Sequence, residues 1–283
     1  MSSQNIAHPQ RWRETCDPFS LKFNNFELKE ILGYPHAGND VFHVRGSVGG
    51  REITAYIKVA RQIGADIKNE VNILSQLHFP IYPDVIDYDR DKYSFSVTAE
   101  MEGLRLSNIV GDNKDMTSLA YMEEYGGALA RLHTLTLQCG RQADRKFYHR
   151  PANELLEKFD IAFLSDFFAK KPECSEAVFC HGDFHYANIL WRDGHISAIL
   201  DFELAGYGDR DFDIAWALFL RPGQRFLRTE EEFERFIHGY TKYAYCNVEA
   251  VRYYMAQCYA YFLGFGDAEY CDYARNWLIH NCQ

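Results

Sequence analysis

The chain has 283 residues, of which 47% are hydrophobic and 25% charged, a composition typical of a globular protein that can bury a sizeable core and form two lobes. Its 30 basic and 40 acidic residues give a formal net charge of 30 − 40 = −10, which disfavours nucleic acid and anionic membrane surfaces as partners. No apolar stretch is long enough to span a bilayer, and residues 1–9 lack the pattern of a secretory signal. We therefore expect a cytoplasmic protein.

The eight cysteines are scattered along the chain and include no CxxC pair. In a chain with a sufficient core, this pattern indicates reduced thiols rather than a disulfide framework, and it does not support a zinc site.

The first hundred residues contain short segments rich in β-branched and aromatic side chains. Turn-forming residues at 46–50 join the second and third of these segments, so we expect an antiparallel sheet. The expected strands are residues 26–32, 41–45, 53–59, 85–88 and 93–98.

Lys58 lies in the middle of an otherwise apolar expected strand. If its side chain faces inward it needs an anionic partner, because burying an unpaired ammonium is costly. Residues 66–77 have helical periodicity and include Glu70, which could supply that partner. The alternative is an exposed lysine at a sheet edge and a solvated glutamate.

From about residue 118 the hydrophobic pattern becomes helical. We expect one helix to end near His133 and another to cover residues 153–170, with the phenylalanines of the second packed in the core. The carboxy-terminal third contains aromatic residues that could stack on a sugar or enclose a quaternary ammonium, although more of them are expected in the core. They are Tyr253, Tyr254, Tyr259, Tyr261, Phe262 and Trp277.

Residues 180–203 carry the strongest functional signal. Asp183 and Asn188 lie five positions apart in a short polar loop between two apolar pieces, and Asp201 ends a second apolar strand that a turn at residues 192–195 would fold back beside Asn188. Phosphoryl transfer needs a carboxylate near the attacking hydroxyl and oxygen ligands for magnesium. The three side chains meet these needs, whereas any one of them alone could simply cap a turn.

The segment from His181 to Asp201 resembles the catalytic and metal-binding core of the aminoglycoside phosphotransferase family, small-molecule kinases with a protein-kinase-like fold. By this resemblance Asp183 is the catalytic base, and Asn188 and Asp201 bind magnesium. His181 is then the structural histidine of the loop. Residues 206–216 resemble the third motif of the family, with Arg210 where proline is usual; its Asp213 would brace the catalytic loop through hydrogen bonds to the loop backbone.

The resemblance also implies a nucleotide site and an α+β, two-lobe fold. Residues 1–102 would form a lobe with an antiparallel sheet and one helix, and residues 103–283 a mainly helical catalytic and substrate-binding lobe. Lys58 and Glu70 would hold the phosphates of ATP, or of GTP. The loop at residues 33–39 would cover the phosphates, and the segment at 100–104 would be the hinge that contacts adenine. Further nucleotide-binding candidates are therefore Gly38, Asn39, Glu100 and Glu102.

The expected reaction is transfer of the ATP γ-phosphate to a hydroxyl of a small molecule, first of all an aminoglycoside or related antibiotic, in the manner of a resistance enzyme. Acidic residues that could bind a cationic acceptor include Glu203, Asp267 and Glu269. Choline, another amino alcohol or another small metabolite is the alternative acceptor. A non-catalytic pseudokinase that only binds ligands is the second alternative, and the chain could be a monomer or a dimer.

Overall fold

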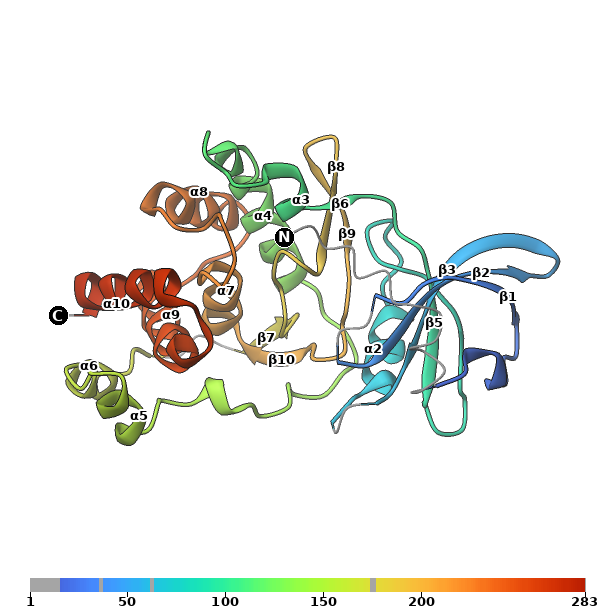
Figure 1. Ribbon diagram of the computed structural model, residues 1–283, viewed down its shortest axis with the longest axis horizontal. Coiled ribbons are helices and arrows are strands. Elements are labelled where there is room, and N and C mark those ends of the chain that lie inside the picture. The colour runs from blue at the N-terminus through green and yellow to red at the C-terminus, as the bar shows by residue number, and fades with distance from the viewer. Residues whose placement is uncertain (1–15, 36–37, 62–63, 174–176, 283) are drawn as a thin grey trace. The chain divides into compact units, whose positions relative to one another are not determined.

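The computed structural model describes residues 16–35, 38–61, 64–173 and 177–282, and Figure 1 shows their secondary structure. The expectation about residues 1–9, the part of the loop at residues 36–37 and the thiol of Cys174 therefore lie outside the described residues. Within the described residues, seven cysteines are free thiols.

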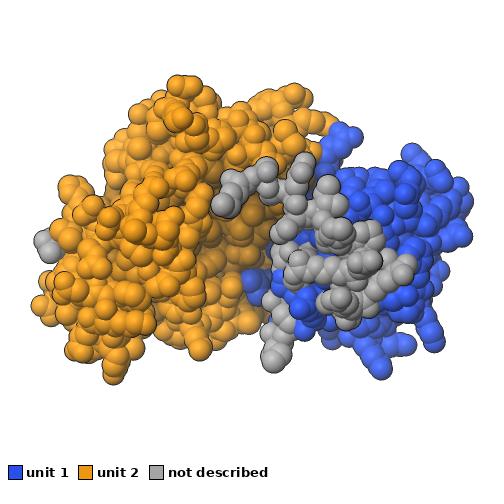
Figure 2. Space-filling model, in the orientation of Figure 1, with its two compact units in different colours: residues 1–102, 198–204 blue, residues 103–197, 205–283 orange. Residues whose placement is uncertain are grey.

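The chain divides into two compact units (Figure 2), each described here by itself. Unit 1 comprises residues 1–102 and 198–204, and unit 2 comprises residues 103–197 and 205–283. One boundary of this division falls after residue 102. The segment at 198–204, which was expected in the second lobe, clusters instead with the first unit.

The described residues of unit 1 form a five-stranded antiparallel sheet in the order β1-β2-β3-β5-β4 and one α-helix, α2. Successive side chains point to opposite faces of each strand. In β3, Ala55 and Ile57 therefore lie in the core, whereas Tyr56 and Lys58 lie on the other face. The elements are β1 (Phe26–Gly33), β2 (Asp40–Val48), β3 (Arg51–Val59), α2 (Ile67–Leu74), β4 (Val85–Tyr88) and β5 (Phe95–Ala99), preceded by a 3-10 turn, η1 (Pro18–Ser20).

Helix α2 begins after Asp66, whose side chain accepts a hydrogen bond from the backbone N–H of Asn69 and so caps the helix. Ile67, Val71 and Leu74 form its buried apolar face. Glu70 is buried as well, which is unusual for a glutamate unless a cation neutralises it.

Unit 2 is mainly helical. Its strands form a two-stranded pair, β10-β7, and part of a small sheet, β6-β8-β9, whose last strand continues into unit 1. The strands are β6 (Leu104–Arg105), β7 (Ala177–Cys180), β8 (Ile189–Arg192), β9 (His195–Ile199) and β10 (Gly206–Asp209). The helices are α3 (Leu106–Val110), α4 (Met122–His133), α5 (Asn153–Lys158), α6 (Leu164–Ala169), α7 (Arg210–Leu218), α8 (Glu230–Thr241), α9 (Val248–Phe262) and α10 (Ala268–Cys282), with short 3-10 turns η2 (Thr117–Ala120), η3 (Lys146–Tyr148) and η4 (Leu263–Phe265).

The single helix expected over residues 153–170 is wrong: two short helices, α5 and α6, occupy this range. Phe159 leaves the helical conformation at the end of α5, and Asp160 has a φ of +55°, in the left-handed region. The phenylalanines recur at helical spacing across this break, so the hydrophobic pattern alone could not reveal it.

Helices α4 and α8 approach so closely that their backbones nearly touch. A Cβ atom added to Gly126 of α4 would lie 2.0 Å from the carbonyl oxygen of Phe236, and one added to Gly239 of α8 would lie 2.0 Å from the carbonyl oxygen of Glu123. Glycine at both positions therefore sets the distance between these helices. None of the helices in the described part of the chain is long and apolar enough to cross a membrane.

Candidate active site

Lys58 of β3 is surrounded by three carboxylates of unit 1. Its Nζ lies 2.9 Å from the Glu70 carboxylate, 2.8 Å from Oδ1 of Asp201 and 3.6 Å from Oε2 of Glu203. Burial lowers the pKa of the ammonium, but the carboxylates outweigh it and hold the pKa above its ordinary value. Burial raises the pKa of Glu70, and Lys58 opposes this shift. The cluster carries three formal negative charges for one positive charge, an arrangement suited to adding a cation.

Asp201 differs from the other two carboxylates because its side chain is 41% exposed, against 5% for Glu70 and 6% for Glu203. It directly follows β9 with a φ of +66°, a conformation that aspartate tolerates better than most residues. One oxygen of Asp201 accepts from Lys58, and the exposure of the side chain leaves the carboxylate accessible to a metal ion.

Glu203 is held by the backbone and side chains of unit 1. Its carboxylate accepts hydrogen bonds from Nδ2 of Asn39 at 2.8 Å and from the backbone N–H of Asp66 at 2.9 Å, and its backbone carbonyl accepts from Asn69. Glu203, expected to recognise the acceptor, is thus engaged within unit 1, where it links the loop before β2 to the start of α2.

The other expected nucleotide-binding residues also lie in unit 1. Gly38 has a φ of +92°, and the side chain of Asn39 is buried in its bond to Glu203, so Asn39 shapes this loop from within. Glu100 pairs with Nε2 of His43 at 3.0 Å, and Glu102 is exposed at the end of the unit.

The loop between β7 and β8, in unit 2, holds Asp183 in a network of donors. Oδ1 of Asp183 accepts from the indole N–H of Trp216 at 2.8 Å, and Oδ2 accepts from Nδ2 of Asn188 at 3.2 Å and lies 3.5 Å from Nε2 of His185. Burial raises the pKa of Asp183, but His185, Arg221 and Trp216 together hold it below its usual range. Asp183 is therefore an anion at neutral pH.

Asn188 has its amide oriented by the same loop. Its Nδ2 donates to the backbone carbonyl of Asp183 at 3.0 Å as well as to the Asp183 carboxylate. Because Nδ2 faces Asp183, the amide oxygen of Asn188 points away from it. This oxygen is a hard ligand of the kind that magnesium prefers.

Asp213 of α7 holds the backbone at the start of this loop. Its Oδ2 accepts from the N–H of His181 and its Oδ1 from the N–H of Gly182, both at 2.9 Å. The buried imidazole of His181 accepts from the N–H of Asp183 at 3.2 Å, so this histidine fixes the loop from inside. These bonds fix the backbone at the start of the loop from two directions.

The atoms of His133, Cys180 and Asp213 that could bind a metal lie within 4.8 Å of one another. Burial raises the pKa of the Cys180 thiol well above its usual value, so it stays protonated. Both ring nitrogens of His133 are already engaged: Nδ1 lies within hydrogen-bonding distance of the Tyr240 hydroxyl, and Nε2 within hydrogen-bonding distance of the Asp213 carboxylate. We interpret the cluster as part of the brace.

Two residues near Asp183 were missed by the sequence reasoning, Trp216 and Arg221. Trp216 is three residues after Asp213 in α7, so the two side chains share a face of the helix, and this spacing could have indicated its role. The guanidinium of Arg221 lies 4.7 Å from the centre of the Trp216 ring, and its Nη2 donates to the Trp216 carbonyl at 2.8 Å. No sequence pattern indicates Arg221, because it lies beyond the end of the helix.

The two acidic residues expected in the carboxy-terminal region are already engaged within unit 2. Asp267 accepts from the backbone N–H of Tyr270 at the start of α10, and exposed Glu269 pairs with Arg225 at 3.3 Å and Arg228 at 2.9 Å. Hydrogen bonds from these arginines lower the pKa of Glu269. Neither residue is an obvious ligand for a cationic acceptor.

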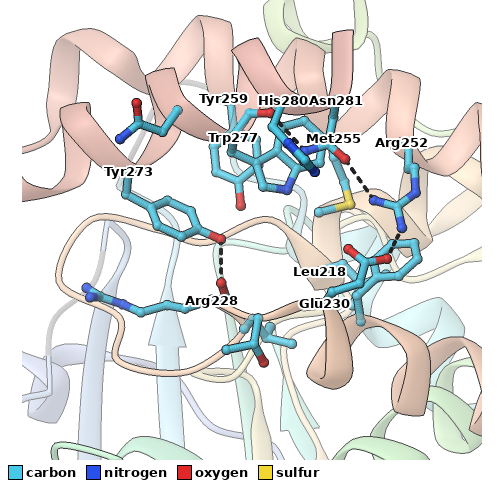
Figure 3. Close-up of a pocket in the computed structure, with 14 residues that line it drawn as sticks. Leu218, Arg228, Glu230, Arg252, Met255, Tyr259, Tyr273, Trp277, His280 and Asn281 are labelled. Atoms are coloured by element: carbon cyan, nitrogen blue, oxygen red, sulfur yellow. Dashed lines mark hydrogen bonds and ion pairs between the residues drawn. The ribbon is translucent and has the colours of Figure 1, made fainter.

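A cavity of about 450 Å³ in unit 2 is lined by residues of α8, α9 and α10 (Figure 3). The rings of Tyr259 and Trp277, 4.8 Å apart, border it, and Arg252, which also borders it, is held by Glu230 and Asn281. Two of the aromatic residues considered for stacking thus border a cavity of a size that can hold a small molecule. Tyr253 and Tyr254 are instead buried in the packing of α9.

The antiparallel sheet with its buried lysine–glutamate pair and the braced Asp183 loop are features of a small-molecule kinase with a protein-kinase-like fold. The model of the phosphotransferase enzyme family matches residues 33–250, and the chain belongs to this family.

Solved structures share the fold. An amicoumacin kinase in complex with AMP-PNP, Ca²⁺ and its ligand is 12% identical, with a TM-score of 0.59 and coverage of 91% of this chain and 90% of that one. A thermostable mutant of the aminoglycoside phosphotransferase APH(4)-Ia with AMP-PNP and hygromycin B is 14% identical, with a TM-score of 0.59 and coverage of 92% and 94%. A Plasmodium vivax ethanolamine kinase is 15% identical, with a TM-score of 0.55 and coverage of 92% and 82%.

Proposed function

We propose that this protein transfers the γ-phosphate of ATP to a hydroxyl group of a small molecule, with magnesium as the metal. The observation that carries the proposal is the environment of Asp183, an anionic carboxylate held by donors from its own loop and from α7. In protein-kinase-like enzymes a carboxylate in such a loop orients the acceptor hydroxyl.

The acceptor oxygen would attack the γ-phosphorus while the bond from that phosphorus to the bridging oxygen breaks, and the hydroxyl proton would pass to the Asp183 carboxylate. Because its pKa is held low, Asp183 is a weak base. It would orient the hydroxyl first and accept the proton late, once the bond to phosphorus has formed.

Asn188 and Asp201 offer the amide and carboxylate oxygens that suit magnesium, and we propose them as its protein ligands. When bound, magnesium neutralises phosphate charge. Lys58, positioned by Glu70, would hold the phosphates of the nucleotide, for which ATP is proposed first and GTP second. Gly38 and the segment at 100–102 are proposed as backbone contacts to the nucleotide. Because ATP is supplied there, we propose the cytoplasm as the location.

For the acceptor we propose first an aminoglycoside or a related antibiotic, and second choline, ethanolamine or another amino alcohol. Glu203, Asp267 and Glu269 are engaged within the protein, so the case for a cationic acceptor no longer rests on them. A neutral hydroxylated antibiotic of the macrolide type therefore belongs in the same test. The pseudokinase alternative predicts the loss of a key residue, whereas Lys58, Asp183, Asn188 and Asp201 are all present.

The test is a turnover assay with the purified chain, Mg-ATP and a panel of aminoglycosides, macrolides and amino alcohols, with ADP release and mass spectrometry of the acceptor as readouts. Asp183→Asn should lower kcat by about a thousandfold or more while nucleotide still raises the Tm. Asp193→Asn is the matched control, because Asp193 is an exposed aspartate in the turn between β8 and β9 and should retain full activity.

Asp201→Asn should raise the magnesium concentration needed for half-maximal turnover, because it removes one charged ligand. An Asp183→Asn variant with wild-type kcat would refute the proposed base. A wild type that binds ATP and consumes none with any acceptor would favour the pseudokinase alternative.

A further inference from the structure

The indole of Trp216 occupies a fixed position against the carboxylate of Asp183. It is 5% exposed, and its ring stacks on Phe147 with centroids 4.5 Å apart and planes inclined by 12°. Phe219 also packs against it at 5.1 Å. A tryptophan N–H can donate but cannot accept, and here it donates to Oδ1 of Asp183. The direction of this bond is therefore fixed by the packing of the ring.

Arg221 fixes the same ring from another side. Its guanidinium lies 4.7 Å from the Trp216 ring and 4.4 Å from that of Phe219, as in a cation–π contact. Its Nη2 is bonded to the Trp216 carbonyl, and its buried Nη1 has no hydrogen-bond partner among the described residues. A guanidinium that gives up a hydrogen bond in a buried position needs compensation, which the two rings and the anion of Asp183 can provide.

The two oxygens of Asp183 are consequently not equivalent. Oδ1 is committed to the indole, whereas Oδ2 accepts the 3.2 Å bond from Asn188 and lies 3.5 Å from Nε2 of His185, a longer contact that an acceptor hydroxyl can replace. Without the indole the carboxylate could rotate about its bond to Cβ, because terminal torsions of aspartate are soft. Misplacing a catalytic group by about 1 Å can cost about a hundredfold in rate.

We propose that Trp216 is a positioning residue for the reaction: its indole N–H sets the orientation of the Asp183 carboxylate so that Oδ2 faces the acceptor hydroxyl, and Arg221 holds the indole in place. This inference rests on the proposed phosphotransfer. It assigns to α7 two tasks in the same loop, since Asp213 holds the loop backbone and Trp216, one turn later, holds the side chain.

The first test uses Trp216→Phe, which retains the aromatic packing and removes only the donor. We expect kcat to fall about 10- to 100-fold, with KM for ATP within twofold of wild type, because the lost bond to a charged acceptor acts on the reacting group and not on nucleotide binding. Trp191→Phe is the matched control: Trp191 is buried in the same unit, but its indole N–H has no hydrogen-bond partner among the described residues. This control should retain wild-type kcat.

Arg221→Met should lower kcat, as Trp216→Phe does. Arg225→Met should leave kcat unchanged, because Arg225 is an exposed residue paired with Glu269. A Trp216→Phe enzyme with kcat within twofold of wild type would overturn the proposal. So would a rise in KM for ATP that accounts for the whole loss of kcat/KM.

The second test does not depend on activity. In protein labelled with ¹⁵N-tryptophan, the indole resonance that disappears in Trp216→Phe is that of Trp216. Asp183→Ala should shift this resonance and leave that of Trp191 in place; an unmoved Trp216 resonance would mean that the bond does not form in solution and would refute the proposal. If the wild type shows no turnover, the proposed function fails while this measurement still decides whether Trp216 holds Asp183.

Discussion

Replacing Lys58 by methionine removes the cation that lies between three carboxylates in unit 1, and the size of the effect follows from the burial of two of them. Glu70 and Glu203 are 5% and 6% exposed, so neither can be rehydrated in place when the ammonium is lost. Removing one partner of a buried ion pair costs about 3–5 kcal/mol, because the remaining charge is left uncompensated. At about 2–4 °C per kcal/mol, a loss near 3 kcal/mol lowers the Tm by about 6–12 °C.

Lys29→Met is the matched control. Lys29 belongs to the same sheet and forms an ion pair of similar length, 3.1 Å, with Glu52, but the two side chains are 40% and 66% exposed. Surface pairs of this kind contribute about 0–1 kcal/mol. Thermal unfolding followed by circular dichroism should therefore separate the variants clearly. If Lys58→Met lowers the Tm no more than Lys29→Met does, the cluster is not electrostatically coupled and the reasoning is refuted.

Two further predictions concern stability alone. Asp87 is 2% exposed, and its Oδ2 accepts hydrogen bonds from three successive backbone N–H groups at residues 24–26. Burial raises the pKa of Asp87, but these bonds lower it overall. Asp87→Ala should therefore reduce the free energy of unfolding by about 3 kcal/mol at pH 7. The folded-state pKa lies below the unfolded value near 3.9, so this contribution is fully present above about pH 5 and declines as the pH falls through the folded-state pKa. The gap between the urea midpoints of the variant and of wild type should therefore narrow at acidic pH, and a constant gap would count against the reasoning. Gly239→Ala should destabilise the protein by about 3 kcal/mol, because its Cβ would meet the backbone of α4. Gly140→Ala is the control and should be neutral, because nothing lies within 4 Å of the added Cβ. Equal urea midpoints for the two variants would disprove the close approach of α4 and α8.

Much of unit 1 could be predicted from the sequence because each strand shows its own pattern. The five expected strands correspond to β1 to β5, with ends that differ by up to three residues. A lysine in an apolar strand, followed by a helix with a glutamate, also carries its own physical requirement. A buried ammonium must find a carboxylate, and Glu70 is the one that the helix brings to it.

The failures arise where the outcome depends on contacts that the local sequence does not contain. Glu269 was a candidate acceptor ligand, but Arg225 and Arg228, more than forty positions earlier in the chain, occupy it. Similarly, nothing near Glu203 in the sequence shows that Asn39 and the start of α2 will fill its carboxylate. The break at Asp160 was hidden for a different reason: a single left-handed residue interrupts a helix without disturbing the hydrophobic pattern.

The bonds from Asp213 to the catalytic loop have a consequence for the order in which the protein matures. His181 and Gly182 are synthesised some thirty residues before the carboxylate that binds their N–H groups. A nascent chain, or a fragment that ends at β10, contains the complete loop sequence but leaves both donors without this acceptor. We therefore expect the loop to reach its final backbone conformation only after α7 has been synthesised and has packed against it. The catalytic loop would then become functional later than its own synthesis.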